Sequence, residues 1–255
     1  MYLTAERLAL ANREIRETFE RTSIAWQAIP HWETGDPAQT RVPNANLTFP
    51  AFENILPQEE PFQLTVAQAT APTPDSVLAV VIAHTVKLAK KVDDDVLTKL
   101  YAAGAPAVTA VGAAALQNTL IGARAKVENA GYRAPACLVT NLGGLEKLSL
   151  LVGGTSMLQQ FLYAANANSL HRAQQLDGGG DANTRLLLVG RRQRIAPGSA
   201  ADAVPGGEPV DLAVSVGPSL EIVGETSTGT IELSVRIRYA TRIKDPSGLA
   251  SRYNP

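Results

Sequence analysis

The chain has few of the side chains that catalysis and metal binding use. Its 255 residues include three histidines and one cysteine, too few for most metal sites and thiol chemistries. No serine lies in the Gly-x-Ser-x-Gly pattern that exposes a hydrolase nucleophile at a sharp turn. His84 could serve as a general base, but it lies in an apolar run, which favours a strand histidine facing solvent or a neighbour. We therefore expect no catalytic residue, no cofactor and no metal ion.

Three polar clusters could bind a ligand, and each also has a simpler interpretation. The aspartates at 93–95 could hold a metal ion, but no histidine or second acidic cluster accompanies them, which favours carboxylates that cap the start of a helix. The glycines at 178–180 lack the lysine of a phosphate-binding loop and indicate a flexible tip. The basic run at 191–194 (RRQR) could touch nucleic acid, but the lack of interleaved aromatic residues favours a solvated or subunit-facing turn.

Composition indicates a folded chain without a strong overall electrostatic field. The 23 basic and 24 acidic residues give a net charge of −1, so no global field draws in nucleic acid. Hydrophobic residues make up 45% and aromatic residues only 5%, which leaves the core largely to Ala, Val, Leu and Ile. No apolar run reaches the roughly 18–20 residues of a membrane span, and we expect no signal peptide. The single cysteine, Cys137, is expected to be a buried and inert thiol.

The first 61 residues predict a helix followed by an extended segment. Apolar residues recur at helical spacing over 4–22, and because a lone amphipathic helix needs a partner, it is either a docking arm or a first helix lying on its own domain. Both interpretations stay open. Residues 29–61 contain six prolines, which predicts an extended arm on a neighbouring surface, with Trp32 as an exposed contact anchor.

The rest of the chain predicts a mixture of helices and strands. Runs at 62–70 and 77–86, joined by turn residues, indicate a long β-hairpin that cannot stand alone in water. The strict alternation over 231–240 predicts a very long closing strand. The order of elements predicts an α+β fold. Further expected elements are helices from Asp93, over 113–130 with Gly131 as its stop, over 145–151 and over 155–165, strands at 136–140, 185–189, 210–216 and 220–223, and a polar loop at 166–183.

Residues 113–154 resemble the central domain of the Hong Kong 97-type capsid fold, which tailed-phage major capsid proteins and encapsulins share. A helix is followed by the strand ACLVT (136–140), by Asn141, by LGGLEKL (142–148) and by a Gly-Gly turn. The closing strands over 211–243 and the ending KDPSGLA (244–250) are similar to the last strands of the same family. The resemblance is one of order and spacing, and it covers most of the chain from about residue 60 onward.

The resemblance implies a division of the chain into the parts of that fold. The extended hairpin contains no lysine at 61–76, so the lysine–asparagine cross-link of some relatives has no donor there, although Asn141 is present. No long N-terminal scaffolding extension is expected. The implied parts are an N-terminal helix and extended arm at 1–57, an extended hairpin loop at 58–78, a peripheral-type region at 79–135 to which the closing strand 230–245 returns, an axial-type domain at 136–229 and a C-terminal tail at 246–255.

The function that the resemblance implies is structural, not enzymatic. We expect copies of the chain to assemble, as pentamers and hexamers, into a closed icosahedral shell. The leading hypothesis is the major capsid protein of a tailed bacteriophage. Its virion would be assembled in the cytoplasm of the bacterial host and would enclose DNA, with scaffold, portal or decoration proteins as further partners and no membrane. The alternative is an encapsulin-type nanocompartment in the bacterial cytoplasm that encloses a cargo enzyme, and a small-molecule enzyme of α+β fold is a third hypothesis.

Two sets of residues are expected to serve this assembly. The first set comprises apolar side chains of the first helix, the extended arm and the hairpin, which should contact other subunits, and the second comprises glycines of loops around an axial pore. The expected subunit contacts are Leu8, Ile15, Phe19, Trp26, Trp32, Phe62, Leu64 and Val66. The expected pore glycines are Gly153, Gly154, Gly178, Gly179 and Gly180.

Overall fold

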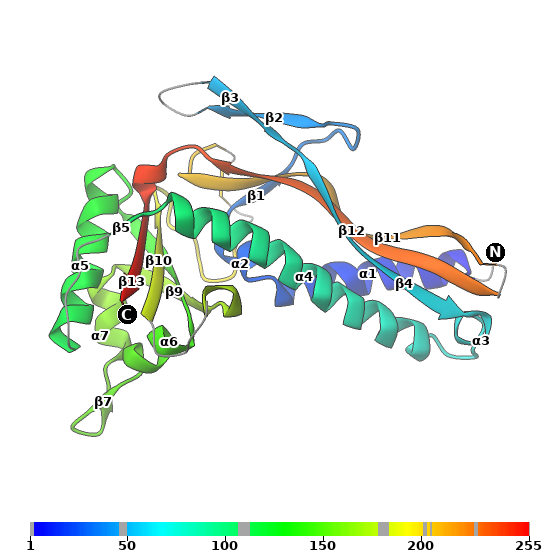
Figure 1. The fold of residues 1–255 in the computed structure, drawn as a ribbon, viewed down its shortest axis with the longest axis horizontal. Helices are drawn as coiled ribbons and strands as arrows, with labels where there is room; N and C mark the ends of the chain where they lie inside the picture. The colour runs from blue at the N-terminus through cyan, green and yellow to red at the C-terminus, as the bar shows by residue number, and fades with distance from the viewer. Residues whose placement is uncertain are drawn as a thin grey trace.

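The molecule is elongated and is built on two β-sheets (Figure 1). The computed structural model describes residues 3–45, 50–106, 113–177, 184–200, 203–204, 206–226 and 229–254. One sheet gives the long, narrow part of the molecule and the other the broader part at one end (Figure 1). A long helix, α4 (Asp75–Ala103), contacts strands of both sheets. These features confirm the predicted α+β class.

The narrow part is a four-stranded sheet in the order β1-β11-β12-β4. Its central pair is antiparallel, and the apolar side chains that alternate along β12 are buried against α1 and α4. The alternation over 231–240 therefore predicted this strand and its buried face correctly. The elements of this part are α1 (Ala5–Thr22), α2 (Ile24–Ala28), β1 (His31–Glu33), β4 (Leu56–Thr65), α3 (Val66–Ala69), β11 (Val210–Glu225) and β12 (Thr230–Ile243).

The broad part is a five-stranded sheet in the order β5-β13-β10-β6-β9. Helices α5 and α7 pack on it through a second apolar core that includes Leu120, Val127 and Phe161. The predicted helix over 113–130 and the strand at 136–140 are confirmed, and Gly131 ends α5 with a φ of 91°. The elements are β5 (Ala105–Pro106), α5 (Ala113–Asn129), β6 (Ala134–Thr140), α6 (Leu142–Leu148), α7 (Leu158–Ala164), β9 (Ala167–Arg172), η1 (Gln174–Leu176), β10 (Thr184–Arg191), η3 (Pro246–Gly248) and β13 (Leu249–Asn254).

Two small hairpins project from these sheets (Figure 1). The larger joins β2 (Arg41–Ala45) to β3 (Pro50–Asn54) beside the four-stranded sheet. The smaller joins β7 (Leu151–Val152) to β8 (Thr155–Ser156) at the far end of the broad part. Gly153 and Gly154 make its turn with φ values of 59° and 82°, a conformation that side chains disfavour.

The predicted hairpin with strands at 62–70 and 77–86 is wrong. The first strand ends at Thr65, a turn of helix follows, and residues 77–86 lie inside α4. Val77, Val81 and Thr85 are buried at helical spacing, so their β-branched side chains pack a helix against the core. The segment 58–78 is therefore not the projecting hairpin, which lies at 41–54.

The three aspartates do not begin a helix, because they lie in the middle of α4. Asp93 caps a different helix. Its carboxylate accepts hydrogen bonds from Ser23 Oγ at 2.7 Å, from the Ile24 N–H at 3.0 Å and from the Ala25 N–H at 2.9 Å, which are at the start of α2. The capping interpretation was right about the chemistry and wrong about the helix.

Several segments expected to be irregular are strands of the chain's own sheets. Residues 29–61 form β1, β2, β3 and the start of β4, and β1 pairs in parallel with β11. The polar loop predicted at 166–183 contains β9 and η1, and the tail at 246–255 contains β13. The helix predicted at 145–151 begins at Leu142, because the Asn141 side chain accepts a hydrogen bond from the Gly144 N–H at 2.9 Å.

Candidate assembly surfaces

Exposed apolar side chains gather on the parts that project. Phe52 of β3 is 68% exposed, and Leu56 at the base of the same hairpin is exposed as well. On the smaller hairpin, Leu151 is 65% exposed and Val152 is exposed beside it. Large apolar side chains in water on projecting elements are typical of surfaces that another protein covers.

A shallow groove lies between α5 and α7 on the outside of the broad part. It encloses about 710 Å³ and is lined by Ile121 and Arg124 of α5 and by Gln160 and Tyr163 of α7. Tyr163 is 83% exposed, so the described part of the chain leaves most of its ring uncovered. The groove and the smaller hairpin both lie on the broad part, distant from the β2–β3 hairpin in Figure 1.

A third concave surface of about 760 Å³ lies between α1, β1 and β11. Trp26 and Trp32 line it, together with His31, whose ring stacks on Trp26 at 3.8 Å between centroids. Both tryptophans are half-buried, and the Trp32 indole nitrogen is buried without a hydrogen-bond partner. Burial lowers the pKa of His31, so the ring is neutral near pH 7.

Half of the predicted subunit contacts belong to the chain's own core. The side chains of Ile15, Phe19, Phe62 and Leu64 are buried between α1, α4 and the four-stranded sheet, so they are not accessible to another subunit and that prediction is wrong for them. The first helix is therefore an element of its own domain. Contacts of other subunits with Leu8, Trp26, Trp32 and Val66, which are half-buried, stay a prediction.

The pore glycines lie partly outside the described residues. Gly153 and Gly154 form the exposed tip of the smaller hairpin. Gly178, Gly179 and Gly180 are not among the residues that the structure describes. The pore assignment stays a prediction.

Two other sequence expectations are corrected by burial. Arg191 is 2% exposed, and it donates to the Ala28 carbonyl at 3.1 Å, so the run at 191–194 is not a free basic patch. His84 lies on α4 and not on a strand, where it stacks on Phe62 at 4.7 Å between centroids and pairs with Glu60 at 3.4 Å. Cys137 is buried as predicted, and burial raises its pKa.

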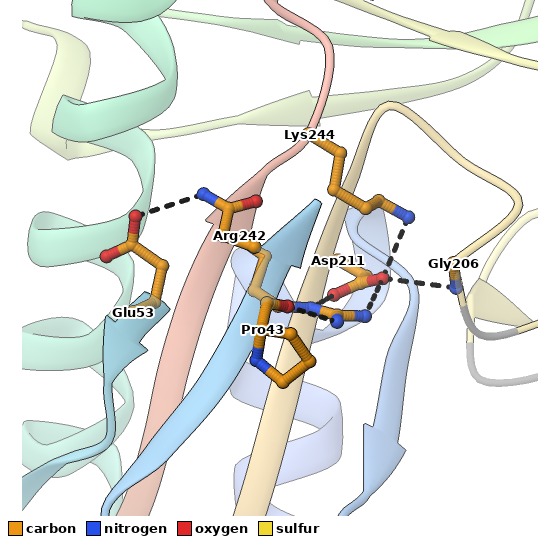
Figure 2. Close-up of polar contacts among 7 residues, drawn as sticks. Pro43, Glu53, Gly206, Asp211, Arg242 and Lys244 are labelled. Atoms are coloured by element: carbon orange, nitrogen blue, oxygen red, sulfur yellow. Dashed lines mark hydrogen bonds and ion pairs between the residues drawn. The ribbon is translucent and has the colours of Figure 1, made fainter. Parts of the chain in front are cut away.

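A buried charged cluster lies where the β2–β3 hairpin leaves the sheet (Figure 2). Asp211 of β11 accepts two hydrogen bonds from Arg242 of β12, both at 2.6 Å, and pairs with Lys244 at 3.0 Å. Burial opposes the charge on Asp211, but the hydrogen bonds from Arg242 and the charges of both cations outweigh it and hold its pKa below the usual value. Burial lowers the pKa of Lys244, although Asp211 acts in the opposite direction.

Sequence reasoning missed this cluster, although one signal was present. Asp211 interrupts the apolar run Val210–Val214, and a charge buried in a strand needs an opposite charge beside it. The partner could not be identified without the register, which places Asp211 opposite Arg242.

The described residues hold no group of three or more His, Cys, Asp or Glu side chains suited to a metal ion. None of the helices they form is both long and apolar enough to cross a membrane. The described part of the chain thus presents surfaces and a buried charged cluster, but no constellation of reacting groups.

Comparison by sequence finds no matching protein-family model and no matching curated protein. Comparison by structure finds several. A virus-like particle protein from Pyrococcus furiosus is 14% identical, with a TM-score of 0.70 over 97% of this chain and 100% of that chain. A subunit of an encapsulin complex from Synechococcus elongatus is 12% identical, with a TM-score of 0.57 over 91% and 87%. The capsid of the myophage XM1 is 11% identical, with a TM-score of 0.57 over 91% and 90%.

At 11–14% identity the likeness establishes the fold. The chain has the Hong Kong 97-type capsid fold, as its resemblance in the order of elements implied. The match extends over nearly the whole chain, so the N-terminal helix, the projecting hairpin and both sheets belong to one fold unit.

Proposed function

We propose that the chain is the subunit of a closed protein shell. The observation that carries this proposal is the full-length match to the virus-like particle protein, with a TM-score of 0.70 over 97% of this chain. The surfaces support the proposal independently, because apolar side chains on projecting elements are exposed to water in a single subunit and would be buried in an assembly. Phe52 and Leu151 are the most exposed of these, and each would be covered by another copy, as would the exposed Tyr163 of α7.

In the proposed shell the two sheets take different positions. The broad part, which contains the predicted axial-type domain at 136–229 except for β11, surrounds the local symmetry axis, with the smaller hairpin near the pore. The four-stranded sheet and α4 form the peripheral part, and the β2–β3 hairpin reaches a neighbouring subunit. This arrangement changes the predicted domain division: the hairpin moves from 58–78 to 41–54, α5 and β13 join the broad part, and β11 belongs to the four-stranded sheet.

We propose the major capsid protein of a tailed bacteriophage as the particular function. The shell would enclose the DNA genome, form in the cytoplasm of the bacterial host, and work with scaffold, portal or decoration proteins. A phage capsid is among the structures that share the fold over 91% of this chain. The ending KDPSGLA, which forms η3 and the start of β13, supports this assignment because of its resemblance to phage versions.

A second candidate function is a nanocompartment shell that encloses a cargo enzyme. It is favoured by the similarity to a subunit of an encapsulin complex, which covers 91% of this chain. In both functions the chain is structural and catalyses no reaction. The two differ only in what the shell contains.

Electron microscopy of the purified full-length protein tests the common part of the proposal. Closed particles of uniform diameter are expected, and a protein that stays monomeric at high concentration contradicts a shell function. The contents of particles purified from the native source then separate the two candidates. Genome-length DNA that resists nuclease supports the phage capsid, whereas a folded protein retained inside nucleic-acid-free particles supports the nanocompartment.

A further inference from the structure

The β2–β3 hairpin has little of its own to hold it in place. It is a two-stranded ladder with five paired positions, from Arg41 opposite Asn54 to Ala45 opposite Pro50, and it projects from both sheets (Figure 1). A hairpin of two strands is at best marginally stable in water. Its direction must therefore be set either by a neighbouring subunit or by contacts at its base.

The apolar contacts at the base are few. Val42 and Ile55 are buried with Ala213 and Ala240 in a small cluster that is separate from the two main cores, and Trp32 packs at its edge. Two of these four side chains are alanines, which fill little volume. Such a cluster holds the base of the hairpin against the sheet, but it has no directional bond that would fix the angle between them.

The directional bond comes from Arg242. Its guanidinium donates through Nη1 to the Pro43 carbonyl of β2 at 2.9 Å, while Nε and Nη2 donate to the two oxygens of Asp211 (Figure 2). The same guanidinium lies 4.7 Å from the centroid of the Trp32 ring. Pro43 has no N–H to donate to the ladder, and its carbonyl accepts the hydrogen bond from Arg242.

The anchor itself is fixed. The Asp211 carboxylate also pairs with Lys244 at 3.0 Å and accepts from the Gly206 N–H at 3.3 Å, and Asp211, Arg242 and Lys244 are all nearly inaccessible to water. A planar guanidinium held by both oxygens of a buried carboxylate has one orientation, unlike an ammonium, which can rotate. The remaining donor of Arg242, Nη1, therefore points in a fixed direction. The Pro43 carbonyl must lie in that direction to accept its hydrogen bond.

We propose that Arg242 is a positioning residue that sets the angle of the β2–β3 hairpin within each subunit, before any neighbour is present. On this proposal the hairpin reaches its neighbour in a fixed direction, and the curvature of the shell depends on that direction. The dependence of shell curvature on the hairpin rests on the proposed shell function, whereas the role of Arg242 within one subunit does not.

Arg242→Lys tests the proposal, because it keeps the positive charge and loses the planar fork. Nitroxide labels at Ala51→Cys on the hairpin and at Lys87→Cys on α4, both exposed positions, report the hairpin angle in dispersed full-length chains. A narrow distance distribution is expected for the native chain, and a broader distribution with a shifted mean for Arg242→Lys. Arg236→Lys is the matched control, since Arg236 is on the same strand and pairs with Glu221 at 2.7 Å.

A distance distribution that is equally narrow in Arg242→Lys overturns the proposal. If Arg242→Lys fails to fold, Arg242→Gln replaces it, because Asp211 then keeps its ion pair with Lys244, and the same broadening is expected. Particle diameters by electron microscopy test the consequence for the shell, where Arg242→Lys should give a wider range of sizes than Arg236→Lys. If no variant and no native chain forms particles, the shell function fails while the label distances still decide the role of Arg242.

Discussion

At the scale of single residues, buried charges fix short elements that have little stability alone. The five-residue helix α2 is the clearest example. The Asp93 carboxylate caps its first N–H groups from α4, and the Arg191 guanidinium donates to the Ala28 carbonyl at its last residue from β10. An anion at the start of a helix and a cation at its end also match the direction of the helix dipole. The link between α1 and β1 is therefore held from two different parts of the fold.

The capping of α2 by Asp93 predicts an unusual pH dependence of stability. Burial is the main cause of a raised pKa, about 6, which three hydrogen bonds only partly offset. The folded-state pKa lies above the ordinary value of 3.8, so protonation of Asp93 favours the folded state. The contribution of Asp93 protonation to the free energy of unfolding is complete below about pH 4 and is lost as the pH rises through about 6. Its upper limit is about 3 kcal/mol.

Urea unfolding between pH 4 and pH 7 measures this contribution. Asp93→Asn should flatten the fall in the free energy of unfolding over that range, because the titrating group is gone. Asp94→Asn serves as the control, since Asp94 is exposed on the same helix and should leave the pH profile unchanged. Parallel profiles for the native chain and Asp93→Asn would contradict the assignment.

At the scale of elements, the periodicity of apolar residues correctly predicted helices and strands that bury one face against the core. β12 was predictable because its alternation is strict, and α5 because its apolar residues recur every three to four positions and stop at Gly131. Residues 77–86 were misinterpreted because they are rich in valine, which is typical of strands, although their buried positions recur at helical spacing.

The elements that sequence reasoning missed depend on pairing with distant segments. β9 and β13 are short and polar, and they are strands because β6 and β10 offer them free edges. The cluster of Asp211, Arg242 and Lys244 was missed for the same reason, since only the register of β11 on β12 brings these charges together. Tertiary contacts override weak local preference in both cases.

The first helix gives a prediction at this scale. Phe19 is fully buried in the chain's own core, so Phe19→Ala should lower the free energy of unfolding by about 3–5 kcal/mol. Denaturant unfolding measures this, and Leu8→Ala, at a half-buried position on the same helix, should cost much less. Were α1 a docking arm, Phe19→Ala would leave the unfolding midpoint in place and only impair assembly.

At the scale of the whole molecule, apolar surface is concentrated on the extremities. The β2–β3 hairpin and the α5–α7 groove with the smaller hairpin lie far apart in Figure 1, and each exposes large apolar side chains. Surfaces on distant parts of one subunit can join different neighbours. Such heterologous contacts generate rings and closed assemblies.

From the exposure of the β2–β3 hairpin we predict that a substitution there can prevent assembly without affecting folding. Phe52 is 68% exposed, so Phe52→Asp should change the free energy of unfolding by no more than about 0.5 kcal/mol. It should nevertheless prevent particle formation, because the charge would be buried at the contact with a neighbour. Size-exclusion chromatography and electron microscopy measure the second effect. Phe52→Leu keeps the apolar contact and should still assemble, whereas normal particles from Phe52→Asp would exclude the hairpin from the interface.

The buried position of Cys137 has a practical consequence. It is the chain's one cysteine, it lies in β6, an inner strand of the five-stranded sheet, and burial raises the pKa of its thiol. A maleimide reagent should therefore leave the native protein unmodified. Any cysteine introduced on an exposed loop becomes the single point of conjugation, so dyes or antigens could be attached at one chosen position per copy without first replacing a native thiol.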